Sequence, residues 1–427
     1  MSPLSGAALS AAPPLARREN ILFPCAGLRW ALCYNGCMRG SIAVSAFALT
    51  FGACDRVPGM PAIDSGIHED GGLLKDGGIH EDGGPLADGG MTVTPCAAPT
   101  PCPSGIDYGV ARTILSFPVQ PVSSFRVHRV AFSASQTELI FLSGQSVQTW
   151  DVQSATAIGT EELSGGLFDV ITAALDGHGE RGVVRRTMLE VDFAFVFALG
   201  GGMTGTWQGV AYSLALSPNG QALAVTTPEG FPSLDQHLTV LSVFGFDEIG
   251  RTQPFPSTRY AGERRIAFSC GGDFISAGDD QGMATVWSVP ASPNAGTPLA
   301  LHGSFQAQEE MISAVALDPR GDTLVVAAGD GSGGSVIRVW DMEGAIERYP
   351  PIALPSPEVW FLNFCPDGST FSALAGQGAL LFSTETGATL ASLDAPSELH
   401  DVRFSDDGLR LAYAASTEVG IWEFGCQ

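Results

Sequence analysis

The sequence predicts an all-β protein folded as a seven-bladed β-propeller, a ring of four-stranded antiparallel sheets. One pattern recurs between Val127 and Phe424: a β-type run ending in a small or acidic residue, a tight turn, a second apolar run and a closing strand. Its spacing, roughly 40 to 50 residues, is typical of a propeller blade. The last copy stops after its third strand. One small sheet cannot bury both faces alone, so the copies are expected to pack side by side.

The copies align on the last residue of their first strand, which is Phe or Leu. The aligned positions are Phe132, Leu216, Phe268, Leu317, Phe364 and Phe404. The interval from Phe132 to Leu216 is about twice the others, so a weaker copy is expected between Asp151 and Gly209. FDVITAAL from Phe168 is its best candidate. Because this copy is weak, counts of six or eight blades stay open beside seven.

The closing strands carry the most specific residues. Trp150-Asp151 and Trp340-Asp341 end third strands, whereas Trp287 and Trp422 keep the Trp without the Asp. SPNG, DPRG, CPDG and SDDG join first to second strands, where Asn, Asp and Gly accept the positive φ of a tight turn. These features resemble the WD-repeat β-propeller family. The family's Gly-His pair is missing, so its buried His-Ser-Trp-Asp hydrogen-bond set is absent and the blades are expected to depend on packing.

Length and charge narrow the class of protein. The chain has 427 residues and a formal net charge of −24. Its hydrophobic content is sufficient for a large core. Nucleic-acid binding needs clustered Lys and Arg, so the charge argues against a phosphate-binding surface.

Residues 1–37 show no periodicity and are interpreted as a non-native or disordered extension, with translation starting at Met38. Residues 38–54 have the layout of a signal peptide: one Arg, a short apolar run, and small residues directly before Cys54. This segment resembles a bacterial lipoprotein signal, which implies lipidation at Cys54 and a protein exported to the cell envelope. The alternatives are a short buried apolar segment and, without processing, a cytoplasmic scaffold.

Residues 55–106 form the next region, rich in Gly, Asp and Pro, with a duplicated segment starting at Gly66. Because this region has few large apolar side chains, their burial cannot offset the entropy lost when the chain becomes ordered. A flexible tether is therefore expected. The duplicated acidic triplets beginning at His68 and His80 could hold a divalent cation weakly. They lack calcium-loop spacing, which favours a solvated linker. The propeller is assigned to residues 107–427 and is expected to be monomeric.

The two ends of the propeller predict how the ring closes. The last blade lacks an outer strand, and ARTILSFPV from Ala111 to Val119 is a strand without another partner, so it is expected to pair with Thr417–Phe424. In an exported protein, that pairing would favour a disulfide between Cys426 and Cys102, or less readily Cys96. Cys96 with Cys102 is the competing local pair.

The remaining cysteines of the repeats and the paired acids have structural interpretations. Cys270 and Cys365 lie near the first turns of separated blades and are expected to be buried thiols. Asp279-Asp280 and Glu309-Glu310 are interpreted as solvated charges beside loops. His178 is expected to be a solvated turn residue between glycines. No catalytic motif is present, so no catalytic residue, cofactor or metal site is assigned.

One position recurs two residues before the apolar residue that opens each first strand. It holds His128, Tyr212, Arg264, Ser313, Trp360 and His400, with Ile171 in the weak copy. The WD-repeat resemblance implies that this position borders the central channel on the face where partners dock. Aromatic, His and Arg side chains are common at binding hot spots. The competing interpretations are packing between blades and a metal site at His128 and His400.

Two insertions depart from the compact repeat: residues 176–209, and the loop from Thr227 to His237 between the second and third strands of the third copy. Lengthened loops often carry recognition. Trp207 and Phe231 are the candidate exposed aromatics, although either could instead cover a blade edge.

The favoured function is a non-enzymatic scaffold, exported and lipid-anchored, that binds a protein or peptide partner at the channel mouth. The alternative is an exported propeller enzyme, lactonase-like or quinone-dependent, with a metal or cofactor in the funnel. An enzyme needs several His, Asp or Glu side chains meeting in the funnel, whereas a binding module needs an exposed aromatic and polar rim. The sequence favours the rim.

Overall fold

The computed structural model describes residues 43–44, 47–48 and 105–426, with gaps at 119–127, 144–145, 164–169, 189–190, 210, 212, 229–235, 255–264, 292–297, 309, 357 and 377. The chain divides into two units, Met1–Leu86 and Ala87–Gln427. In the first, β1 (Ala43–Val44) pairs with β2 (Phe47–Ala48). The rest of the predicted extension, signal and tether before Gly105 lies outside the described residues. No helix among the described residues is long and apolar enough to span a membrane.

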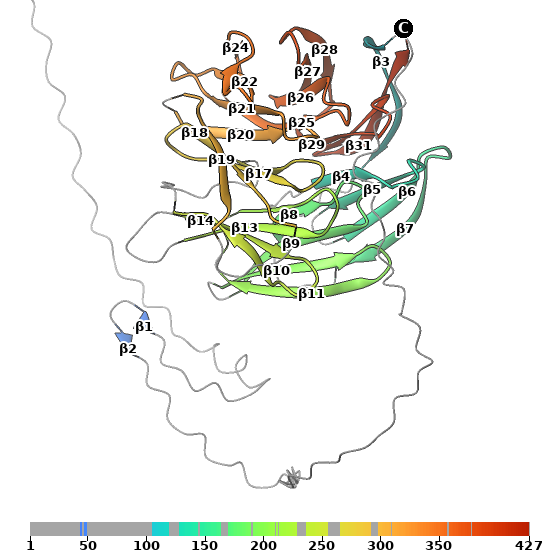
Figure 1. Ribbon diagram of the computed structural model, residues 1–427. Coiled ribbons are helices and arrows are strands. Elements are labelled where there is room, and N and C mark those ends of the chain that lie inside the picture. The colour runs from blue at the N-terminus through green and yellow to red at the C-terminus, as the bar shows by residue number, and fades with distance from the viewer. Residues whose placement is uncertain are drawn as a thin grey trace, which may run out of the picture. The chain divides into compact units, whose positions relative to one another are not determined.

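The second unit confirms the predicted all-β, seven-bladed propeller (Figure 1). Every blade is antiparallel and runs outward from its first strand. Blade 1 contains β4 (His128–Phe132), β5 (Glu138–Ser143), β6 (Ser146–Asp151) and β7 (Thr156–Glu162). Blade 2 contains β8 (Val170–Leu175), β9 (Arg181–Met188), β10 (Val191–Ala198) and β11 (Gly202–Gly209). Blade 3 contains β12 (Ser213–Leu216), β13 (Ala222–Pro228), β14 (Gln236–Ser242) and β15 (Glu248–Arg251).

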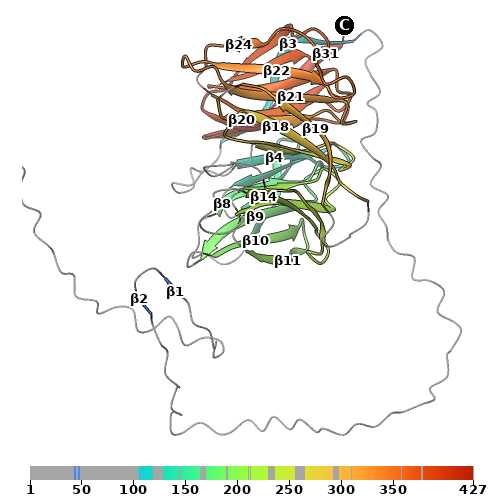
Figure 2. The ribbon, with the colours of Figure 1, turned by 60° about the vertical axis from the view of Figure 1, so that its left-hand side comes forward.

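The later blades follow in chain order around the ring (Figure 2). Blade 4 contains β16 (Ile266–Phe268), β17 (Phe274–Gly278), β18 (Met283–Ser288) and β19 (Ala300–Gln306). Blade 5 contains β20 (Ile312–Leu317), β21 (Thr323–Gly329), β22 (Ser335–Asp341) and the short β23 (Ile346–Glu347) and β24 (Ile352–Leu354). Blade 6 contains β25 (Val359–Phe364), β26 (Thr370–Ala375), β27 (Gly378–Ser383) and β28 (Thr389–Asp394).

Blade 7 joins the two ends of the ring. It contains β29 (Leu399–Phe404), β30 (Arg410–Ala415), β31 (Glu418–Cys426) and, as its outer strand, β3 (Ile106–Pro118). The register places Phe117 opposite Val419 and Ile106 opposite Cys426. The predicted closure is therefore confirmed, with β3 starting earlier than the sequence suggested. Because β3 pairs with β31, the edge of β31 that faces away from β30 is not left unpaired.

The core is divided into seven hydrophobic clusters, each between neighbouring blades. The cluster between blades 7 and 1 contains Leu115 and Phe117 from β3, Val130 and Phe132 from β4, and Val419 from β31. Each blade buries both faces only because it has a neighbour on each side. Packing between sheets therefore holds the ring together, as the missing His-Ser-Trp-Asp set led us to expect.

In six of the seven blades the turn after the first strand is capped by the residue that precedes it, and blade 6 has Cys365 at this position. Ser217 Oγ accepts a hydrogen bond from Ala222 N at 2.9 Å, and Ser133, Ser269 and Ser405 cap their turns in the same way. In blades 2 and 5 a carboxylate replaces the hydroxyl: Asp176 Oδ2 accepts from Arg181 N, and Asp318 Oδ1 from Thr323 N. The small or acidic residue in the sequence pattern is thus a turn cap.

The predicted Trp residues lie on third strands, opposite a large apolar residue of the second strand. Trp340 faces Leu324 in blade 5, and its ring centroid lies 5.8 Å from that of Phe305 in the outer strand of blade 4. The Asp of the pair does not enter the core. Asp341 Oδ1 accepts a hydrogen bond from Gly344 N, so this carboxylate caps the turn to the outer strand.

Blade 2 is the weak copy, and it forms where the sequence placed it. At the register position of Trp340 it has Phe197, and opposite Phe197 stands Gly182 instead of Leu324. A Cβ at Gly182 would lie 2.2 Å from Phe197 Cζ. The glycine therefore makes room for the aromatic ring, and this substitution pair hides the repeat from a pattern search.

The two insertions have different outcomes. Residues 176–209 form β9, β10 and β11 of blade 2, so most of this stretch is blade and not a loop. Trp207 is half-buried and packs against the core between blades 2 and 3, which makes it a cover for the blade edge. The second insertion does join β13 to β14, but residues 229–235, including Phe231, lie outside the described residues.

Candidate functional site

Three of the six predicted rim residues share one structural feature. In blades 5, 6 and 7 the pairing of first and second strands skips one residue, and the skipped residues are Ser313, Trp360 and His400. Ile171 is skipped in the same way in blade 2. A β-bulge of this kind redirects the side chain of its extra residue. Spacing alone gave no sign of these bulges.

Their contacts differ. Ser313 is buried, and its hydroxyl donates to Ala327 O of the neighbouring strand at 3.2 Å. His400 is half-buried, and its Nε2 lies 2.9 Å from Ser416 Oγ. Trp360 is half-buried against the core between blades 6 and 7. Trp360 and His400 thus combine packing with partial exposure.

The other three rim residues are less fully described. His128 begins β4, with its backbone opposite Ser143, and nothing is described of its side chain. Tyr212 and Arg264 lie outside the described residues. The rim is therefore known directly over blades 5 to 7 only.

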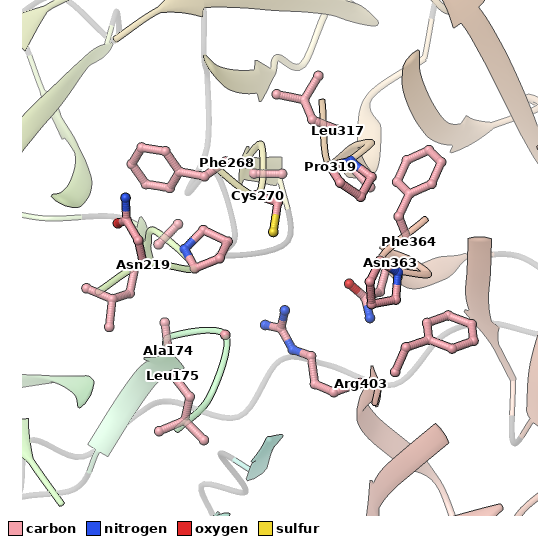
Figure 3. Close-up of a pocket in the computed structure, with 18 of the residues that line it drawn as sticks. Ala174, Leu175, Asn219, Phe268, Cys270, Leu317, Pro319, Asn363, Phe364 and Arg403 are labelled. Carbon is pink, nitrogen blue, oxygen red and sulfur yellow. The ribbon is translucent and has the colours of Figure 1, made fainter. Parts of the chain in front are cut away.

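A cavity of about 700 Å³ lies among the first strands of the blades. It is lined by residues of these strands and by the turns that follow them, including Asn219, Cys270 and Pro319 (Figure 3). Ser313, Trp360 and His400 do not line it, although Phe361, directly after Trp360, does. The cavity therefore extends from just beyond the rim residues to the first turns.

One register position gives this cavity its asymmetry. The position directly before the aligned Phe or Leu is alanine in blades 1 to 5, but blades 6 and 7 have Asn363 and Arg403. Ala174, Ala215, Ala267 and Ala316 line the cavity beside these two residues. Small side chains on one side leave space for long polar ones on the other. The aligned copies already contained this signal, which the sequence interpretation missed.

Arg403 extends into the middle of the cavity (Figure 3). Its guanidinium carbon lies 5.4 Å from the centre of the Phe361 ring. Its Nε is buried and makes no hydrogen bond within the described residues, and it lies 3.8 Å from Asp401 Oδ1. Asp401 is itself buried, and its Oδ2 accepts a hydrogen bond from Val130 N in blade 1. The nearest carboxylate is therefore committed to joining blades 7 and 1.

His178 and Asp406, which both line the same cavity, form a pair between two blades. His178 Nε2 of blade 2 lies 3.2 Å from Asp406 Oδ2 of blade 7, so the pair links two blades that have blade 1 between them in the ring. The hydrogen bond with Asp406 raises the pKa of His178 above its ordinary value of 6.5, against the opposing effect of burial. The sequence placed His178 correctly on a turn, but the side chain is paired and not simply solvated.

The acidic pair Asp279-Asp280 corrects a second interpretation, because neither residue is a solvated charge. Asp280 and Arg265 form an ion pair in which both side chains are over nine-tenths buried. Asp279 accepts hydrogen bonds from Gln281 N and Met283 N, while burial raises its pKa. These carboxylates stabilise the hairpin of blade 4. No group of three His, Cys, Asp or Glu side chains suited to a metal occurs among the described residues.

The cysteines give a mixed result. Cys365 is a buried free thiol, as predicted. Cys270 was expected to be one as well, but it is disulfide-bonded, so that prediction was wrong. Cys426 is disulfide-bonded too. The predicted partner, Cys102, lies outside the described residues, as do Cys96 and Cys54, so this pairing and the lipidation site stay predictions.

Comparison with known proteins bears on the fold alone. No family model matches the sequence, and no curated protein sequence matches it. Among solved structures, a chain from a crystal structure of the mitotic checkpoint complex is similar, with a TM-score of 0.56 and 13% identity. The match covers 73% of this chain and 95% of that chain. At this identity the similarity supports the propeller architecture and not an activity.

Proposed function

We propose that this protein is a non-enzymatic interaction scaffold of the WD-repeat type, which binds a protein or peptide partner where the first strands enter the channel. The bulges in blades 5, 6 and 7 carry the proposal, because they set Ser313, Trp360 and His400 at equivalent places on successive blades. Trp and His combine contact area with a directed polar tip, as binding hot spots require. A rigid ring holds them without the ordering cost of a loop.

The similar structure supports the proposal in a limited way. That chain comes from the mitotic checkpoint complex, and it shares the propeller architecture over most of its length. The enzyme alternative gains no support from the geometry. The described cavity lining does contain His178, Asp273 and Asp406, but His178 is paired with Asp406, and no group of three such side chains suited to a metal occurs among the described residues.

The experiment is cross-linking in the native cell followed by affinity purification, with the recovered partner identified by mass spectrometry. The test variant is Trp360→Ala with His400→Ala. Phe244→Ala is the matched control, since Phe244 is 71% exposed and lies in the turn between β14 and β15, away from the rim. Loss of one defined partner in the double variant alone supports the proposal. Equal recovery of that partner from all three proteins would refute it.

We also propose that the protein is exported and anchored to the cell envelope by a lipid on Cys54. The proposal rests on the signal-like layout of residues 38–54 and on the Gly-, Asp- and Pro-rich region that follows. Intact mass of the native protein tests it. A mature chain beginning at Cys54 with an added acyl mass is expected, and Cys54→Ser should abolish that mass. Full-length, unmodified protein in the soluble fraction would contradict export.

A further inference from the structure

The channel cavity has the size of a small-molecule site. Its volume of about 700 Å³ falls within the roughly 300–1,000 Å³ of ligand pockets. Its lining mixes apolar side chains, such as Leu175 and Phe268, with polar ones, such as Asn219 and Gln221. Such a lining can cover an apolar body and fix its orientation with directed polar contacts.

Arg403 is the polar group that distinguishes this cavity from an ordinary channel. Arginine is the residue that pairs with planar anions through two parallel hydrogen bonds. Here its guanidinium lies near the Phe361 ring, and its buried Nε makes no hydrogen bond within the described residues. A buried N–H without a hydrogen-bond acceptor is costly, so an acceptor from a ligand would stabilise it.

The charges and the apolar side chains around Arg403 favour a ligand that carries a single negative charge and an apolar body. Asp401 lies 3.8 Å from the Arg403 Nε and already offsets part of the positive charge. The cavity lining itself includes Asp273 and Asp406, the latter paired with His178. A dianion would meet repulsion from these carboxylates, whereas a monocarboxylate would need only the one guanidinium. The apolar walls would cover the rest of the molecule.

We propose that this cavity is a binding site for a small organic monocarboxylate, held by Arg403 with Asn363 beside it and Phe361 beneath. This site is separate from the rim on which the proposed partner would dock. Arg129 also lines the cavity, but its Nε donates a hydrogen bond to Ala173 O. Arg403 is therefore the arginine left to select for charge, while the apolar part of the lining selects for an apolar body.

Isothermal titration calorimetry on the full chain at neutral pH tests this site. Benzoate is the probe, benzamide its uncharged isostere, and inorganic phosphate the competing anion. Benzoate is expected to bind at least ~10-fold more tightly than benzamide, because hydrogen bonds to a charged group contribute more than neutral ones. Phosphate is expected to bind more weakly than benzoate. No benzoate binding at millimolar concentration, equal affinity for benzamide, or tighter binding of phosphate would each overturn the proposal.

Three variants locate the site. Arg403→Gln should weaken benzoate binding by ~10-fold or more. Arg320→Gln is the matched control, because Arg320 is an exposed arginine in the first turn of blade 5, on the same face but outside the cavity lining. Its benzoate affinity should be unchanged. A loss equal to that of Arg403→Gln would mean general electrostatics and overturn the proposal.

Ala174→Leu keeps the arginine but fills space opposite it, so it should weaken benzoate and benzamide alike. Thermal unfolding of each variant shows whether it is folded. If Arg403→Gln does not fold, Ala174→Leu decides the matter, and an unchanged benzoate affinity in that variant overturns the proposal.

Discussion

Blade 5 and blade 2 have the same architecture but fill it differently. In blade 5, Trp340 on the third strand faces Leu324 on the second. In blade 2 the matching pair is Phe197 and Gly182. Both arrangements bury the ring at the same position, since Trp340 and Phe197 are both buried. A blade therefore needs side chains that together fill the space at this position, and it does not need a Trp there.

The first turns of the two blades extend the comparison. Asp318 in blade 5 and Asp176 in blade 2 cap equivalent turns, where most other blades use serine. Burial raises the pKa of both carboxyls, and for Asp176 it does so to about 6, with a further contribution from Glu180. Blade 2 thus carries a carboxylate that the fold accommodates poorly. The serine caps of four other blades show that an acceptor oxygen without a charge serves this turn equally well.

The largest expected effect comes from emptying the shared position. Trp340→Ala in blade 5 should lower the free energy of unfolding by about 3–5 kcal/mol, because it removes a large buried ring and leaves a cavity. Chemical denaturation measures the loss. Phe244→Ala serves as the control, since its 71% exposed ring should contribute little. A loss at Trp340 no greater than at Phe244 would contradict the role of packing.

Overfilling the same position in blade 2 should cost less. Gly182→Ala is expected to destabilise by about 1–3 kcal/mol, because the new Cβ would overlap the Phe197 ring, from which it would lie 2.2 Å away. Gly159→Ala is the matched strand control: nothing lies within 4 Å of its Cβ position. That variant should be neutral in the same denaturation assay. Equal stability of the two variants would show that Gly182 is not needed to make room for the Phe197 ring.

The turn carboxylates predict a dependence on pH. A carboxyl whose pKa is raised in the folded state favours folding when protonated, so this contribution is lost as pH rises from about 4 through about 6. Asp176→Ser keeps the acceptor and removes the charge. It should be more stable than the wild type at pH 7 by on the order of 2 kcal/mol, with a flatter profile between pH 4 and 7. Asp318→Ser should show a smaller gain. Denaturation midpoints measured across this pH range test the prediction. A stability profile of Asp176→Ser that runs parallel to that of the wild type would contradict the raised pKa of Asp176.

The smallest effect concerns the residue two positions later, where blade 5 has Arg320 and blade 2 has His178. Because the pKa of His178 is raised, its pairing with Asp406 stabilises the fold fully below pH 6.5, and this contribution is lost as pH rises through the folded-state pKa. For a partly exposed pair we expect about 0–1 kcal/mol. His178→Gln should remove it, measured in an Asp176→Ser background to separate the two titrations. An unchanged profile between pH 5 and 8 would show that the pair contributes nothing.

Much of the ring was predictable from residues that act locally. The first-strand ends, the turn caps and the Trp strands recur in the alignment, and the unpaired last unit required a strand such as β3. Blade 2 was located by spacing alone. Its composition could not be interpreted, because the exchange at Phe197 and Gly182 makes sense only when both strands are seen together.

The candidate sites were less predictable, because they depend on contacts across the ring. Sequence cannot give disulfide connectivity, so Cys270 was misassigned. The pairing of Arg265 with Asp280 is also invisible in the pattern, although it determines that Asp280 is buried. Arg403 belongs to a column of alanines, but its significance appears only when the seven first strands surround one cavity.

The pairing of β3 with β31 also constrains the order of assembly. During synthesis β3 leaves the ribosome before the other propeller strands, and its mate β31, which ends at Cys426, follows only after the strands of the first six blades. Six sheets can be completed before β31 is made, but the seventh must wait for it. Until then β3 exposes an unsatisfied row of peptide groups, so the nascent protein is most vulnerable to aggregation just before β31 emerges.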